Sequence, residues 1–420
     1  MMIGEILATG DEILTGALID SNSAYIAQLL EETGVRVVRH HCVGDDLDML
    51  TLIFKEIAGR SDIAVVTGGL GPTADDVTAE AAAKAAGVEL VSDPKALKSI
   101  EAFFAARNSE VTASNKKQAL LPAGAACLLN PVGTAPGFRL RLDSCLFFFV
   151  PGVPHEMRHM MTTHVVPHII NTLSEKRSFY VKKTISSFGL GESVTAERLS
   201  GFEGEFTDIK LGLRAKFPEI QVKLYGSGTD KDELIRRLAH ASGWVVGRIG
   251  GHVFSENGEA MGEVVGALLK EQHKTLAIAE SCTGGLISDM ITNVPGSSEY
   301  FLFAGTTYAN QAKEEIIGVS PSTLATYGAV HEQTVKEMAD GVKRISGASY
   351  GLSTSGIAGP DGGTEEKPVG TVCIGLATPR ISVGRRFRFY NYDRLRNKQI
   401  FAMTALDLLR RDLLGMEQSQ

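Results

Sequence analysis

The segment Ala279-Glu-Ser-Cys-Thr-Gly-Gly285 contains residue types that could carry out nucleophilic chemistry. It follows an apolar run, 275–279, that predicts a buried strand, and it precedes 286–294, which predicts the start of a helix. Ser281 would therefore be held at a turn at the end of a sheet, beside two glycines that let backbone approach a ligand. The helix N-terminus would offer free N–H groups to an oxyanion. The alternative interpretation is a helix cap, in which the serine or threonine of the segment satisfies orphan donors.

A second segment, Thr306-Thr-Tyr-Ala-Asn-Gln-Ala-Lys313, could supply a base. We expect a strand to run into Tyr308, Asn310 to be an N-cap, and Lys313 to lie in the first turn of the next helix. The positive end of the helix dipole disfavours an ammonium ion, so this position should lower the pKa of Lys313. A lysine with a lowered pKa suits general-base chemistry better than it suits stability.

Length and composition limit the possible classes. A chain of 420 residues predicts two or three domains, and 44% hydrophobic with 22% charged residues is typical of a globular protein. The net charge of −7 argues against a general nucleic-acid binder. Five scattered cysteines without metal-type spacing indicate reduced thiols of a cytoplasmic protein. Neither a leader pattern nor an apolar stretch approaching ~18 residues is evident, so we expect no membrane segment.

Strands alternate with helices in the first part of the chain, which predicts an α/β sheet with right-handed crossovers. Polar turns at 9–12, 43–46 and 68–76 come after three expected strands, and ligands of such folds bind beyond the C-terminal strand ends. The glycines of the third turn suit a phosphate, and the acids of all three suit hydroxyls or a hydrated divalent metal. Alternatively, Asp75 and Asp76 charge the first turn of a helix that begins near residue 77. The loops at 130–137 and 151–157 could wall the same cleft.

The first 170 residues resemble the molybdopterin-binding fold of the MogA, MoaB and MoeA proteins. The likeness lies in Thr9-Gly-Asp-Glu12 and in Gly68-Gly-Leu-Gly-Pro-Thr-Ala-Asp-Asp76, and it implies that Asp45 and Asp76 hold the ligand. We expect a nucleotide to bind at Gly10, Asp11, Glu12, Asn22, Asp45, Gly68, Gly69, Gly71, Thr73 and Asp76. We expect a divalent metal ion, of unknown identity, at Asp11, Asp75 and Asp76.

Short strands at 182–187 and 221–225 and helices at 192–199 and 232–241 predict a small α+β middle domain. Its Gly189-Leu-Gly191 lacks the GxxG spacing of the loop with which KH modules clamp RNA. Basic residues are interspersed with acids, so a spacer or dimer-forming role is favoured over RNA binding; these residues are Lys210, Arg214, Lys216 and Lys223. The glycine-rich stretch 250–258 is expected to be a linker.

The last part of the chain predicts further helices at 260–272, 332–346 and 394–414 and strands at 350–354 and 369–377, without an internal repeat. With the N-terminal and C-terminal parts taken together, the whole chain resembles the CinA family of competence/damage-inducible proteins. The C-terminal motifs that carry this likeness are Ala279–Gly285, Tyr308-Ala-Asn-Gln-Ala-Lys313, Gly356-Ile-Ala-Gly-Pro360 and Lys367-Pro-Val-Gly-Thr371.

The resemblance implies three domains: a molybdopterin-binding-like domain at 1–170, a KH-like domain at 171–255 and a deamidase domain at 256–420. It implies that the last domain hydrolyses the carboxamide of nicotinamide mononucleotide, and that the first is a metal-dependent ADP-ribose pyrophosphatase. The expected partners are small nucleotides and a second copy of the chain in a homodimer. The alternative is a regulatory protein that binds a nucleotide or pterin without turnover, and fold alone cannot separate the two.

Amide hydrolysis assigns roles to the C-terminal motifs. Ser281 would attack the carboxamide, neutral Lys313 would take its proton, and Tyr308 would relay a proton or orient the amide. Cys282 is a rival nucleophile, but no motif histidine would pair with it, so it is expected to be structural. Arg394 and Arg396 would either supply positive charge to the substrate phosphate or simply lie in the solvated first turn of a helix. No cofactor is expected here, and the expected substrate-binding residues are Thr283, Gly284, Gly285, Asn310, Gly356, Gly359, Gly362 and Gly363.

Overall fold

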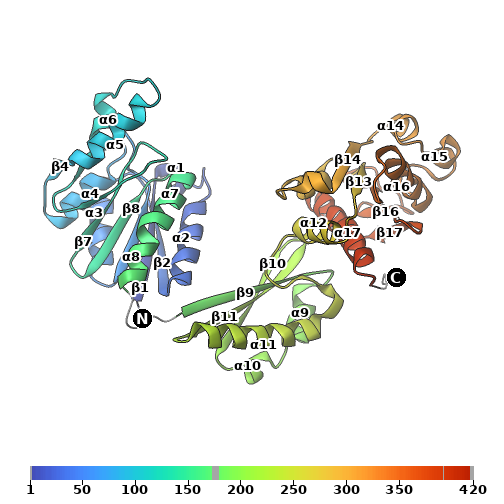
Figure 1. The fold of residues 1–420 in the computed structure, drawn as a ribbon, viewed down its shortest axis with the longest axis horizontal. Helices are drawn as coiled ribbons and strands as arrows, with labels where there is room; N and C mark the ends of the chain where they lie inside the picture. The colour runs from blue at the N-terminus through green and yellow to red at the C-terminus, as the bar shows by residue number, and fades with distance from the viewer. Residues whose placement is uncertain (1, 173–178, 391, 417–420) are drawn as a thin grey trace. The chain divides into compact units, whose positions relative to one another are not determined.

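The computed structural model describes residues 2–172, 179–390 and 392–416. These residues form two compact units, 1–181 with 227–235, and 182–226 with 236–420. Three sheets with accompanying helices and one small two-stranded sheet make up this part of the chain, the mixed α/β architecture that the sequence predicts (Figure 1). None of the helices described is both long and apolar enough to cross a membrane.

The first sheet has six strands in the order β2-β1-β3-β8-β7-β6, with a parallel centre and two antiparallel strands at one edge. The first three strands fall where the sequence predicts them, whereas the antiparallel edge was not predicted. The strands are β1 (Met2–Thr9), β2 (Val35–Val43), β3 (Ile63–Thr67), β6 (Ala126–Leu128), β7 (Gly137–Leu142) and β8 (Cys145–Val150). A separate two-stranded antiparallel sheet pairs β4 (Leu90–Ser92) with β5 (Leu120–Pro122).

Helices cover both faces of this sheet, because its central strands are apolar on both sides. One core packs α3 and α4 against a face rich in phenylalanine, and the other packs α2, α7 and α8 against the opposite face. The helices are α1 (Asp11–Leu14), α2 (Ser21–Glu32), α3 (Leu47–Ala58), α4 (Thr78–Ala86), α5 (Pro94–Ala105), α6 (Ala113–Lys117), α7 (Pro154–Met160), the π-helix η1 (Met161–Val165) and α8 (Val166–Thr172).

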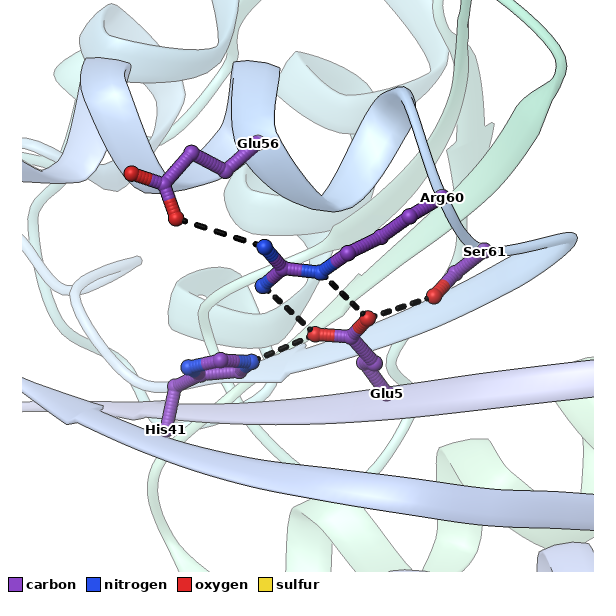
Figure 2. Close-up of polar contacts among 5 residues, drawn as sticks. All are labelled: Glu5, His41, Glu56, Arg60 and Ser61. Atoms are coloured by element: carbon purple, nitrogen blue, oxygen red, sulfur yellow. Dashed lines mark hydrogen bonds and ion pairs between the residues drawn. The ribbon is translucent and has the colours of Figure 1, made fainter.

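A buried carboxylate fixes the start of β3 to β1 and β2 (Figure 2). Glu5 is only 1% exposed, and it accepts hydrogen bonds from Arg60 Nε at 2.8 Å and Nη2 at 3.0 Å and from Ser61 Oγ at 2.7 Å. His41 Nε2 lies 2.5 Å from the same carboxylate. Burial alone would raise the pKa of Glu5, but these hydrogen bonds and the charge of Arg60 outweigh it and lower the pKa to about 2.

The middle sheet has four strands in the order β10-β11-β9-β12. The prediction of a linker at 250–258 is wrong in part, because Val253–Ser255 form β12 and pair with β9. The glycines around this segment obscured a strand whose Phe254 is buried. The elements are β9 (Phe179–Phe188), α9 (Glu192–Arg198), α10 (Phe202–Glu205), β10 (Ile209–Lys216), β11 (Glu219–Gly228), α11 (Lys231–Ile249), the 3-10 helix η2 (Gly250–His252) and β12.

The last sheet has five strands in the order β14-β13-β15-β16-β17, of which the first three are parallel and the last two antiparallel. Helices α12, α13 and α17 pack on one face and α16 on the other. The elements are α12 (Met261–Glu271), β13 (Leu276–Glu280), α13 (Leu286–Thr292), η3 (Ser297–Glu299), β14 (Phe301–Thr306), α14 (Asn310–Glu315), α15 (Pro321–Tyr327), α16 (Glu332–Ser346), β15 (Tyr350–Gly356), β16 (Thr371–Ala377), β17 (Ser382–Arg388) and α17 (Arg394–Leu413).

Glu5→Gln should lower the free energy of unfolding of the N-terminal domain by about 2 kcal/mol, because it removes a charged acceptor from buried donors. Glu5 has a lowered folded pKa, so its contribution is present above the unfolded value of 4.5 and is lost as the pH falls from there toward about 2. The variant should therefore show a shallower loss of stability in acid, measured by denaturant unfolding. Glu56→Gln, at a more exposed partner of Arg60, is the matched control and should cost within about 0.5 kcal/mol. Equal effects of the two changes would contradict this account.

Candidate functional site

Three loops of the C-terminal sheet converge because they leave the same edge of adjacent parallel strands. Ser281 follows β13 directly, and its N–H donates to Thr354 O of β15 at 3.0 Å. Glu280 at the end of β13 pairs in register with Thr306 of β14 on one side and with Thr354 on the other. The segment after β14 therefore begins beside the loop that carries Ser281, and this segment leads directly into α14.

The structure brings Ser281 and Lys313 together. Lys313 Nζ lies 3.3 Å from Ser281 Oγ and also donates to the backbone oxygens of Thr307 at 2.9 Å and Tyr308 at 3.0 Å. The Lys313 side chain is 0% exposed, whereas Ser281 retains 9% exposure. A serine that is slightly exposed to solvent thus contacts a fully buried lysine amine.

Burial lowers the pKa of Lys313, because desolvation disfavours the ammonium ion. A negative charge on Cys282 would oppose this, but burial raises the pKa of the Cys282 thiol to about 12, so it stays neutral at physiological pH. This neutral, buried thiol agrees with the structural role that the sequence suggested for Cys282. The direction is the one predicted for Lys313, and desolvation is its main cause.

The predicted free N–H groups at the start of α13 are already used. Glu280 accepts hydrogen bonds from the N–H groups of Gly285 at 2.9 Å, Ile287 at 3.2 Å and Ser288 at 2.9 Å, and from Ser288 Oγ at 2.5 Å. The capping alternative is also wrong, since the cap position is Gly285 and the Thr283 hydroxyl instead pairs with that of Thr354 at 2.7 Å. Glu280, which the sequence analysis passed over, anchors the turn that carries Ser281.

Tyr308 lies at the mouth of the site rather than inside it. Its side chain is 59% exposed, and its hydroxyl accepts a hydrogen bond from Arg394 Nη2 at 3.1 Å. Arg394 Nη1 also donates to Gly359 O at 2.6 Å, so the arginine links the Tyr308 segment to the Gly359 loop. Arg394 and Arg396 are both exposed, and their role at a phosphate site stays a prediction. Asn310 is the first residue of α14 and not its cap, which is Ala309.

The predicted glycines serve two different purposes. Gly284 and Gly285 have φ values of +59° and +95°, which allow the turn after Ser281. Gly356 and Gly363 instead permit close packing, because a Cβ would lie 2.7 Å from Thr371 O at the first and 2.8 Å from Val369 N at the second. Gly359 contributes its carbonyl, as described above, and Gly362 has a φ of +88° in the same loop.

A cavity of about 540 Å³ lies at the C-terminal strand ends of the first sheet. The predicted nucleotide-binding residues line it, apart from Asp11 and Thr73. Those two act on their neighbours: Asp11 exchanges backbone-to-carboxylate hydrogen bonds with Asp45, and Thr73 donates to Asp76. The loops that carry Thr134 and Pro151 also line the cavity, as predicted.

The charge of this cavity is one-sided. No lysine or arginine is among the described lining residues, whereas six carboxylates are: Glu12, Asp20, Asp45, Asp75, Asp76 and Glu156. Burial, with the nearby charges of Asp11 and Glu12, raises the pKa of Asp45. The described residues contain no group of three or more histidine, cysteine, aspartate or glutamate side chains placed to hold a metal ion. The predicted metal residues thus do not form a complete site by themselves.

The middle domain does contain a GxxG turn, which the sequence analysis missed by considering only Gly189–Gly191. Gly201-Phe-Glu-Gly204 begins at the N-cap of α10, Gly201, and continues into that helix, and GxxG is the spacing with which KH modules clamp a nucleic-acid backbone. Phe202 is buried, however, and Glu203 places a negative charge in the turn. This local chemistry disfavours a phosphate backbone.

Comparison with known proteins identifies the family. Three family models match, described as "Probable molybdopterin binding domain" over 5–171, "Damage-inducible protein CinA KH domain" over 182–255 and "CinA C-terminal domain" over 258–413. A CinA-like protein of Desulfosudis oleivorans is 51% identical over 98% of this chain and 100% of its own length. The chain belongs to the CinA family. Another member, a CinA-like protein of Desulforapulum autotrophicum, is 46% identical over 98% of both chains.

One solved structure is similar to part of the chain. The crystal structure of the CinA protein from Thermoplasma acidophilum, described as of unknown function, is 35% identical to the aligned part. It covers 40% of this chain and 98% of that protein, with a TM-score of 0.38.

Glu280→Ala should loosen the Ser281 turn, because four buried or partly buried donors lose their acceptor. We expect the free energy of unfolding to fall by about 2–3 kcal/mol and the buried Cys282 thiol to react faster with a thiol reagent. Labelling in a Cys42→Ser background, which removes the exposed thiol, measures the second effect. Asp289→Ala, at an exposed carboxylate that accepts from Asn293 Nδ2, is the control. Unchanged Cys282 labelling in a folded Glu280→Ala protein would show that Glu280 does not hold the turn.

Proposed function

We propose that the C-terminal domain hydrolyses the carboxamide of nicotinamide mononucleotide to nicotinate mononucleotide and ammonia. The observation that carries this proposal is a fully buried lysine amine 3.3 Å from a serine hydroxyl. A serine with a neutral amine as its base is an established arrangement for acyl transfer. Membership of the CinA family and the motifs around both residues support the choice of substrate.

The hydrogen bonds of Lys313 suit a neutral amine. Its two N–H bonds can go to the Thr307 and Tyr308 carbonyls, which leaves the lone pair for the Ser281 hydroxyl proton. In the proposed reaction Lys313 takes this proton as Ser281 Oγ attacks the carboxamide carbon. The tetrahedral intermediate then collapses, the C–N bond breaks, and the Lys313 ammonium protonates the leaving nitrogen. Lys313 next deprotonates a water that cleaves the ester, which releases the acid and frees Ser281.

The oxyanion of this intermediate needs donors other than the start of α13. Glu280 takes the N–H groups of Gly285, Ile287 and Ser288. We therefore assign the oxyanion to the N–H groups of the residues that separate Ser281 from Gly285. We assign Tyr308 to orienting the substrate at the mouth, since its exposed hydroxyl is bonded to Arg394.

We infer a second site in the N-terminal cavity, which would bind ADP-ribose for pyrophosphate hydrolysis or, alternatively, hold a nucleotide or pterin without turnover. Its acceptor-rich wall suits hydroxyl and amino donors. Its lack of basic residues means that a phosphorylated ligand would need an accompanying divalent cation, held jointly by the carboxylates and the ligand. The proposed setting of both sites is cytoplasmic pyridine-nucleotide salvage by a homodimer.

Ser281→Ala should reduce ammonia release from nicotinamide mononucleotide by roughly 10³-fold or more, because the attacking oxygen is lost. The chain should stay folded, since the change removes one hydroxyl from the protein interior. Ammonia release by the full chain and circular dichroism provide the two readouts, and Cys282→Ser is the matched control at the adjacent position. Near-normal turnover by a folded Ser281→Ala protein would rule out Ser281 as the nucleophile.

The rate should rise with pH through the lowered pKa of Lys313, because only the neutral amine can accept the serine proton. Lys313→Arg keeps the positive charge but cannot become neutral, so kcat should fall by about 10²-fold or more. Profiles of kcat/KM against pH for both proteins test this. A Lys313→Arg protein that keeps the kcat and the pH profile of the parent would make Lys313 a fixed cation instead.

Asp76→Ala should weaken ADP-ribose binding to the full chain in the presence of a divalent metal, because Asp76 lines the cavity and orders Thr73. Titration calorimetry with Mg²⁺, Mn²⁺ or Co²⁺ should show heat that this variant reduces about tenfold or more in affinity. Glu101→Ala on the exposed face of α5 is the control. Equal ADP-ribose affinity of the parent and of Asp76→Ala, or an affinity that is the same with and without the metal, would contradict the proposed second site.

A further inference from the structure

Helix α17 brings two cationic side chains to the mouth of the Ser281 site. The first, Arg394, is already engaged, because it donates to Gly359 O and to the Tyr308 hydroxyl. It therefore ties together two of the three loops that surround Ser281. Its hydrogen bonds identify it as a positioning residue for Tyr308. The N-terminus of α17 itself is capped by Asp393, which accepts from Arg396 N–H, so it is not free to bind a ligand.

Lys398 lies one helical turn after Arg394 and reaches the third loop. Its Nζ is 3.6 Å from the position that a Cβ on Gly284 would occupy, which places the ammonium beside the turn that carries Ser281. Gly284 is exposed and Lys398 half-buried, so solvent reaches the turn beside which this ammonium lies. The turn that carries the nucleophile and the Lys398 cation are thus neighbours.

Lys398 has no hydrogen-bond or ion-pair partner among the described residues. Lys270, Lys343 and Lys367 of this domain do have partners: Lys270 pairs with Glu299, Lys343 donates to Thr378 O, and Lys367 donates to Tyr327 O. An ammonium group without a protein acceptor can bind an anion at the turn beside it. The carboxamide on which Ser281 is proposed to act is neutral, so the anion must be another part of the substrate.

We propose that Lys398 binds the phosphate monoester of the nucleotide and thereby makes the site select nucleotides over nucleosides. A phosphate monoester offers several acceptor oxygens and close to two negative charges, which match the three donors of an ammonium group. Lys398 is then a specificity-determining residue that touches the substrate far from the reacting carbon. The inference rests on the proposed function, because it assigns the non-reacting part of the same substrate.

The test compares nicotinamide mononucleotide with nicotinamide riboside, which has the same carboxamide and lacks the phosphate. The full chain should hydrolyse the nucleotide with the higher kcat/KM, and Lys398→Met should reduce that preference about tenfold to a hundredfold, mainly through KM. Lys398→Arg should retain part of the preference. The matched control is Lys274→Met, a half-buried lysine just before β13, at the opposite end of that strand from Ser281. A Lys398→Met protein with the preference of the parent would overturn the proposal.

Failure of the proposed function would give a different result from failure of the phosphate site. In that case the parent protein would release no ammonia from either compound. Titration calorimetry with ribose 5-phosphate then decides the role of Lys398 by itself. Heat that is seen with the parent and with Lys274→Met but is lost with Lys398→Met supports the phosphate site. Equal heat with all three proteins, or none with the parent, overturns it.

Discussion

The cost of burying the Lys313 ammonium governs the chemistry of the C-terminal domain. Its side chain is 0% exposed, and the acceptors around it are two backbone carbonyls and one serine hydroxyl rather than a carboxylate. Without a counter-charge, desolvation favours the neutral amine. The same burial that would be a penalty for stability therefore suits the role of base that we propose for Lys313.

The surrounding fold maintains this arrangement, and in doing so it uses backbone N–H donors at the start of α13. Adjacent parallel strands deliver Ser281 and Lys313 to one edge of the sheet, and Glu280 holds the turn between β13 and α13. Because Glu280 uses three N–H groups at the start of α13, the proposed oxyanion site needs other backbone groups. The first domain uses strand ends similarly, but its cavity is lined by acids.

Much of this could be predicted from the sequence, because apolar runs and polar turns mark parallel strands and their ends. The meeting of Ser281 with Lys313 agrees with that pattern. Glu280 could not be recognised, since only the structure shows its side chain folding back onto α13. Gly356 and Gly363 resembled ligand-binding glycines, yet contacts with residues after them in the chain explain both. The antiparallel strands β7 and β17 mix charged with apolar residues, so they lack the continuous apolar pattern that marks the buried strands.

The protonation state of Lys313 is the central claim, and NMR can measure it directly. In protein labelled with ¹³C at the lysine ε-carbons, the Lys313 resonance is assigned by its disappearance in Lys313→Arg and followed against pH. The account predicts titration well below the ordinary lysine value of about 10.4. Titration at or above that value would contradict it, because the amine would then be a permanent cation at physiological pH.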